Sequence, residues 1–161
     1  MKDDDKTPYK LCLDVLHKLQ DSGVLKDLVL VGSWCVYFYK DWFEYGDELS
    51  AIRTTDIDFL IPTPPRIKSP TDIPNLLSPM GFTIDIRGQR YMRLQHPEMV
   101  IDFLVPEKGK GTDVSFPIKD LGINATPLRF LNLLLDHCRV PPIRPHINPT
   151  YRAPPRRGWT V

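Results

Sequence analysis

Two apolar segments, one ending in Gly-Ser and the other carrying two aspartates, constrain the fold of this chain more than any other feature. Residues 28–31 read Leu-Val-Leu-Val and run directly into Gly32 and Ser33. This pattern is typical of a buried strand that turns tightly into a helix. Residues 56–61 read Asp-Ile-Asp-Phe-Leu-Ile, which predicts a second strand. We therefore expect a sheet built around these two segments.

The second of these strands places two carboxylates side by side. Side chains alternate across a strand, so Asp56 and Asp58 share one face. Ile57 and Phe59 then point to the other face, toward a core. Two carboxylates on one rigid strand repel each other unless a positive group lies between them. Mg²⁺ fits this position, because it takes hard oxygen ligands and leaves sites for phosphate oxygens.

A third carboxylate, Asp102, fits the same scheme. Residues 99–105 read Met-Val-Ile-Asp-Phe-Leu-Val, an apolar strand with one aspartate in its middle. Burying an unpaired charge in such a strand is costly. Asp102 is therefore expected either at the rim of the sheet or paired with a cation.

Together these motifs resemble the nucleotidyltransferase superfamily that has the fold of DNA polymerase β. Small stand-alone bacterial members carry Gly-Ser followed by Arg-x-Thr-x-Asp-Ile-Asp, which is compressed here to Arg-Thr-Thr-Asp-Ile-Asp at residues 53–58. The similarity covers roughly residues 25–137. The combination carries the resemblance, since Gly-Ser alone or Asp-x-Asp alone is a weak signal.

The resemblance implies metal-dependent transfer of a nucleotidyl group from a nucleoside triphosphate, such as ATP, to a hydroxyl acceptor. It implies about two Mg²⁺ ions. The residues that it assigns as catalytic and metal-binding are Asp56, Asp58 and Asp102. The residues that it assigns to nucleotide binding are Gly32, Ser33, Arg53 and Thr54. Taken alone, Gly32 and Ser33 also fit an ordinary strand–helix turn, and Arg53 fits a plain surface arginine equally well.

The acceptor stays open among a small molecule, a tRNA end and a protein side chain. Some relatives are toxins of toxin–antitoxin pairs, which favours the last two. One alternative is a catalytically impaired, truncated relative that binds a nucleotide or a partner as a scaffold. A glycosyltransferase, in which Asp-x-Asp binds the metal of a nucleotide sugar, ranks lower because it does not explain the Gly-Ser turn or Asp102.

The remaining patterns predict an α+β fold, a mixed β-sheet of about five strands with helices packed mainly on one face. Strands are expected near residues 28, 57, 83, 92 and 102. Helices are expected from Thr7-Pro8 to Gly23, after Ser33 with the N-terminus toward the phosphates, around 72–78 and over 127–137. In the hairpin of residues 82–94, Asp85 alternates with two isoleucines and is expected to face solvent.

Composition narrows the class of protein. A chain of 161 residues with 42% hydrophobic residues suits one folded domain, and a net charge of +1 argues against strong non-specific nucleic-acid binding. Three widely spaced cysteines, Cys12, Cys35 and Cys138, are expected to be reduced thiols of a cytoplasmic protein. The sequence shows no signal-peptide pattern and no apolar run long enough to cross a bilayer, so no membrane partner is expected.

The last segment, residues 139–161, differs in character from the rest. It holds five arginines, six prolines and no acidic residue, and it has no hydrophobic periodicity. We expect residues 1–138 to form the nucleotidyltransferase-like domain and residues 139–161 to be an extended or disordered tail. Relatives continue into further helices that complete the nucleotide cleft, so the C-terminal part of the family is expected to be missing here.

Overall fold

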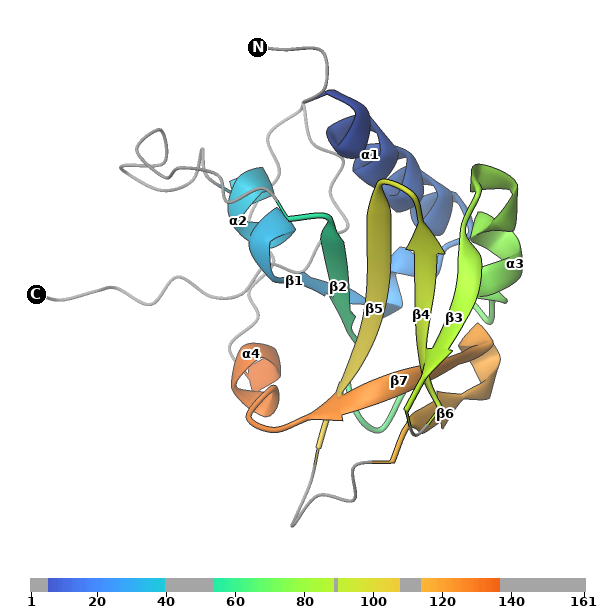
Figure 1. Cartoon of the computed structure of the whole chain (residues 1–161). Helices are drawn as coiled ribbons and strands as arrows, with labels where there is room; N and C mark the ends of the chain where they lie inside the picture. Colours follow the sequence, from blue (N-terminus) through green and yellow to red (C-terminus); the bar gives the residue numbers. More distant parts are fainter. Residues whose placement is uncertain (1–5, 40–53, 89, 108–113, 137–161) are drawn as a thin grey trace, which may run out of the picture.

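The computed structural model describes residues 6–39, 54–88, 90–107 and 114–136, and these form an α+β fold (Figure 1). The elements in chain order are α1 (Lys6–Asp21), β1 (Val29–Val31), α2 (Ser33–Tyr39), β2 (Asp56–Leu60), α3 (Ile73–Leu77), β3 (Thr83–Arg87), β4 (Tyr91–His96), β5 (Met99–Pro106), β6 (Phe116–Ile118), β7 (Ile123–Leu128) and α4 (Asn132–Asp136).

The sheet is mixed, as the sequence predicts. Its main order is β1-β2-β5-β4-β3, with β2 parallel to β5 and the other neighbours antiparallel. Past the first residues of β4, which runs antiparallel to β5, β7 pairs in parallel with the last residues of β5, and β6 pairs with β7. The described part of the sheet therefore has seven strands, two more than predicted.

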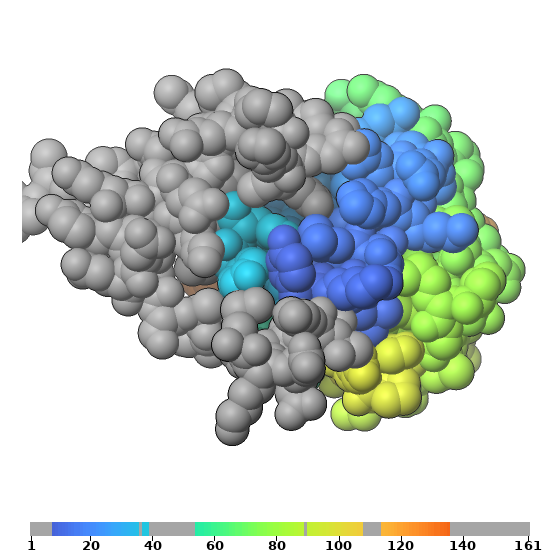
Figure 2. Space-filling view, turned by 90° about the horizontal axis from the view of Figure 1, so that it is seen from above, coloured from blue at the N-terminus to red at the C-terminus, as the bar shows by residue number. Residues whose placement is uncertain are grey.

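One face of the sheet carries the main core. Ile57, Phe59, Ile101 and Phe103 are at most 1% exposed and lie in one cluster with buried residues of α1 and α3. The rings of Phe59 and Phe103 stack across β2 and β5 with their centroids 6.2 Å apart. Figure 2 shows α1 between α2 and the green segments that follow β2. Burying side chains of this size stabilises the fold by roughly 1.5–3 kcal/mol each.

The other face is divided into an apolar end and a polar end. At the apolar end, Val29, Val31 and Leu60 are buried in a second cluster with leucines of α4 and the residues just before it. At the polar end, Asp56 is exposed and Asp58 is half-buried. Strand β2 contributes to both ends, since Asp56, Asp58 and Leu60 are alternate residues of β2 and so share one face. This face therefore leaves its charged end accessible.

Most predicted elements are confirmed. The first helix, the aromatic helix after Ser33, the short helix near residues 72–78, the 82–94 hairpin and the strand of Asp102 all form. The short helix begins after Asp72, whose side chain accepts a hydrogen bond from the Asn75 amide at 3.0 Å. Cys12 and Cys35 are buried thiols, whereas Cys138 lies outside the described residues.

The predicted helix over residues 127–137 is wrong in its first half. Thr126 and Pro127 belong to β7, and α4 begins only at Asn132. The Thr-Pro pair resembles a helix start, but the alternating burial of Ile123 and Ala125 shows the period of a strand. Pairing of this segment with the end of β5 overrides the local helix signal.

The tail predicted from residue 139 and the domain boundary at 138 lie outside the described residues and stay predictions. Over the part of the chain that the structure describes, the helices are all too short or too polar to cross a bilayer.

Candidate functional site

Strands β2 and β5 bring two of the predicted carboxylates together. The strands pair in parallel with Asp58 directly beside Asp102, so both side chains lie on the same face of the sheet. Asp56, two residues before Asp58, pairs with Val100 and lies on this face as well. The three acidic residues predicted from the sequence therefore come from adjacent strands and one face.

The Gly-Ser turn lies directly against this pair. Gly32 follows β1, whose last residue pairs with Asp58, and it has a φ of 77°. A Cβ atom at this position would lie 2.6 Å from Oδ2 of Asp58. Only glycine combines this left-handed backbone with so close an approach. The turn thus places its backbone beside a carboxylate oxygen.

Two of the residues predicted to bind the nucleotide touch each other. The hydroxyl groups of Ser33, the first residue of α2, and Thr54, just before β2, form a hydrogen bond. Thr54 also donates to the backbone carbonyl of Asp56 at 3.4 Å. The chain entering β2 is therefore held against the Gly-Ser turn. Arg53 lies outside the described residues, so its assignment stays a prediction.

Asp58 is the electrostatically strained member of the site. Burial, followed by the neighbouring charges of Asp102 and Asp56, raises its pKa to about 6, and Arg93 opposes the shift. Among the described residues, no basic side chain forms an ion pair with Asp58 or Asp56. This arrangement favours a bound positive charge or a proton at Asp58.

Arg93 is a residue of the candidate site that the sequence prediction missed. It lies on β4 directly opposite Asp102. Its Nε donates to Oδ1 of Asp102 at 2.7 Å and its Nη2 donates to Oδ2 at 2.5 Å. This is the two-pronged geometry in which arginine binds carboxylates most strongly. The hydrogen bond to Asp102 is the main cause that raises the pKa of Arg93.

A signal for Arg93 is present in the sequence. Strands β4 and β5 are joined by the two-residue turn Pro97-Glu98, with His96 paired to Met99. So short a turn fixes the register of a hairpin, which places Arg93 opposite Asp102.

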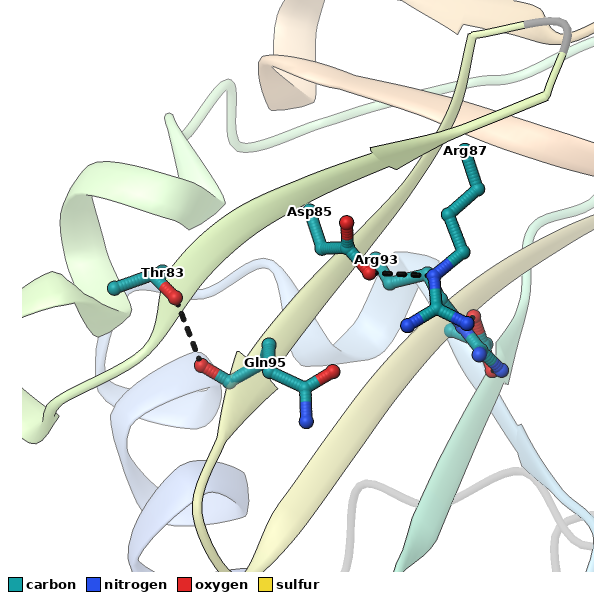
Figure 3. Close-up of polar contacts among 6 residues, drawn as sticks. Thr83, Asp85, Arg87, Arg93 and Gln95 are labelled. Carbon is teal, nitrogen blue, oxygen red and sulfur yellow. Dashed lines mark hydrogen bonds and ion pairs between the residues drawn. The ribbon is translucent and has the colours of Figure 1, made fainter.

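The charged row continues onto β3. Asp85 lies opposite Arg93 and on the same face, and it pairs with Arg87 at 2.6 Å (Figure 3). The prediction that Asp85 faces solvent holds only in part, because its side chain is 32% exposed and the residues on either side of it on β3 are more exposed. The isoleucines on either side of it, Ile84 and Ile86, lie on the edge strand and are themselves more than half exposed.

The donor chemistry at this face suits a hard divalent cation. Carboxylate oxygens are the ligands that Mg²⁺ takes in proteins, and three carboxylates share the face. However, within the described ranges no three acidic, imidazole or thiol side chains are gathered closely enough to hold a metal ion. Asp102 has both oxygens engaged by Arg93, which leaves Asp56 and Asp58 as the carboxylates not bound to a cation.

Comparison with known proteins agrees with this arrangement. A family model described as nucleotidyltransferase matches residues 10–143, a range that contains every residue of the site. No curated protein and no solved structure gives a significant match. The match extends over most of the chain and includes both strands that carry the carboxylates. The chain therefore belongs to this nucleotidyltransferase family.

Proposed function

We propose that this protein transfers a nucleotidyl group from a nucleoside triphosphate to a hydroxyl acceptor, with Asp56, Asp58 and Asp102 as the catalytic carboxylates. The observation that carries the proposal is the parallel pairing of Asp58 with Asp102 beside the Gly-Ser turn. Membership of the nucleotidyltransferase family supports the reaction class and a nucleoside triphosphate as substrate.

Asp56 and Asp58 would hold Mg²⁺, and Asp102 would complete the ligand set for a second ion. When bound, Mg²⁺ neutralises phosphate charge and lowers the pKa of an acceptor hydroxyl. The raised pKa of Asp58 supports this assignment, since a cation would relieve the repulsion among the carboxylates. In the reaction, the acceptor oxygen bonds to the α-phosphorus while the bond to pyrophosphate breaks. Asp102 would take the hydroxyl proton.

Gly32, Ser33 and Thr54 would contact the phosphates of the nucleotide. The contact between the Ser33 and Thr54 hydroxyls supports a shared role, because it holds both groups at one position. Each hydroxyl has a single hydrogen, so donating to a phosphate oxygen would replace the hydrogen bond that it makes here. Arg53 is the further candidate on sequence grounds, since a guanidinium pairs well with phosphate.

The test combines the purified chain with Mg²⁺ and each of ATP, GTP, CTP and UTP. Pyrophosphate release is measured, together with transfer of α-labelled nucleotide to small alcohols, total tRNA and protein. We expect Asp58→Asn to lower the rate by about a hundredfold or more, because it removes charge from the reacting centre. Asp14→Asn, which changes an exposed carboxylate of α1 paired with Lys10, is the matched control and should keep full activity.

The second candidate function is a nucleotide-binding protein without turnover. The pairing of both Asp102 oxygens with Arg93 favours it, because it withholds one carboxylate from a metal. Binding of nucleotide without pyrophosphate release would support this candidate. Absence of both binding and release would exclude both candidates. We do not propose a glycosyltransferase, since the family match indicates nucleotidyl transfer.

A further inference from the structure

The pair formed by Arg93 and Asp102 occupies the position that a metal ligand would need. Both oxygens of Asp102 accept hydrogen bonds from the guanidinium, at 2.7 and 2.5 Å. The pair is largely shielded from water, with the side chains of Arg93 and Asp102 exposed by 32% and 14%. An ion pair in such a position is screened little by salt, so it competes effectively with other cations.

A guanidinium and a divalent cation repel each other and seek the same oxygens. Asp102 cannot give both oxygens to Arg93 and ligate a metal at the same time. By contrast, neither Asp56 nor Asp58 has a basic partner among the described residues. The two halves of the site therefore differ in their readiness to bind a cation.

We propose that Arg93 is a positioning residue that competes with a divalent cation for Asp102, so that Asp102 becomes a metal ligand only when the guanidinium releases at least one oxygen. This inference rests on the proposed function. It makes metal binding stepwise: a first ion binds at Asp56 and Asp58, and a second ion binds more weakly because it must displace Arg93.

The neighbouring strand offers a matched control. Arg87 of β3 lies on the same face and forms a similar pair with Asp85, at 2.6 Å (Figure 3). It carries the same charge as Arg93 but does not contact any proposed metal ligand in the described residues. Removing Arg87 changes the general field over this face without removing either partner of the Arg93–Asp102 pair.

Mn²⁺ alone, without nucleotide, is the probe. Electron paramagnetic resonance of free Mn²⁺ gives the number of bound ions and their affinities for wild type, Arg93→Gln, Arg93→Lys and Arg87→Gln. We expect the second site to tighten by about tenfold or more in Arg93→Gln, the scale of a charge-assisted contact. Arg93→Lys, which keeps the charge but not the two-pronged geometry, should fall between the two. Arg87→Gln should match wild type.

Two further readouts separate competition from a merely structural role. Mn²⁺ should raise the melting temperature of Arg93→Gln more than that of wild type, because the metal replaces the lost partner of Asp102. In the wild-type protein, the NMR signal of the Arg93 Nε–H should shift as Mg²⁺ is titrated, and this readout does not depend on the folding of any variant.

Equal Mn²⁺ numbers and affinities in wild type and Arg93→Gln, with an unmoved Arg93 Nε–H signal, would overturn the role of Arg93 and leave the proposed function standing. Weaker binding in Arg93→Gln would overturn it too. If none of the proteins binds Mn²⁺, this inference fails, and pyrophosphate release with Mg²⁺ and a nucleoside triphosphate then decides the proposed function on its own.

Discussion

The two faces of β2 differ in character: one is apolar and buried, and the other carries charged side chains. Ile57 and Phe59 are completely buried on one face, whereas Asp56 and Asp58 lie on the other, exposed and half-exposed. The first pair stabilises the fold through burial. On the other face, partial burial of Asp58 and then the charges of Asp102 and Asp56 raise the pKa of Asp58. We call the face of Ile57 and Phe59 the closed face and the face of Asp56 and Asp58 the open face. Burial on the closed face supplies the stability that offsets the unfavourable cluster of charge on the open face.

The largest expected effect comes from the closed face. Phe59→Ala removes a fully buried ring that stacks on Phe103, so the free energy of unfolding should fall by about 3–5 kcal/mol. Urea denaturation followed by circular dichroism measures the change. Phe116→Ala changes a ring that is 40% exposed on β6 and should cost much less. Similar losses for both variants would contradict the assignment of the core.

Gly32→Ala tests the junction between the two faces. The added methyl group would meet Oδ2 of Asp58, and the φ of 77° is strained for alanine, so stability should fall by about 1–3 kcal/mol. In the background Asp58→Ala the methyl group has room, and the cost should shrink to the backbone strain. Equal costs in both backgrounds, measured as a double-mutant cycle, would show that Gly32 does not approach Asp58.

Asp58→Asn tests the open face through pH, with a chelator present. The folded-state pKa of Asp58, about 6, lies above its ordinary value, so the folded protein holds this proton more tightly than the unfolded chain. That contribution to stability is present below about pH 4 and is lost as pH rises toward 6. The amide introduced by Asp58→Asn stays neutral throughout this range.

Near pH 4 the side chain of Asp58 is protonated and neutral in the folded protein, so the melting temperatures of Asp58→Asn and wild type should be close. At pH 7 the melting temperature of Asp58→Asn should be the higher of the two. Asp14→Asn, at an exposed position, should show no such divergence with pH. A constant difference between Asp58→Asn and wild type across this range would contradict the raised pKa.

The smallest effect is expected away from both faces. Lys10→Gln breaks an exposed ion pair with Asp14 on α1, where the side chains are 78% and 45% exposed. Exposed pairs contribute little, so the free energy of unfolding should change by less than about 0.5 kcal/mol. A change as large as that of Gly32→Ala would mean that the α1 surface is packed against something further.

Local periodicity was enough to predict the five strands of the main order and the shared face of Asp56 and Asp58. The alternation of residues 56–59 separates the aspartates from the core residues without any knowledge of their neighbours. The same reasoning failed at Thr126-Pro127, where a helix-start pattern competes with strand pairing to β5. There the decisive contact is distant in sequence, so local propensity gives the wrong element.

The contacts that shape the site depend on register, which a single strand does not reveal. The pair of Arg93 with Asp102 follows from the short turn at Pro97-Glu98, and the contact of Ser33 with Thr54 follows from the pairing of β1 with β2. Arg53 and the tail after residue 138 lie outside the described residues and stay predictions.

The parallel pairing of Asp58 with Asp102 also has a consequence for folding fidelity. A slip of β2 by one residue would turn both of its aspartates into the hydrocarbon interior and expel Ile57 and Phe59 into water. A sheet with this shifted register would bury unsolvated charge, so it would be unstable and unfold. The aspartates proposed as catalytic residues therefore also help to fix the register in which β2 pairs with β5.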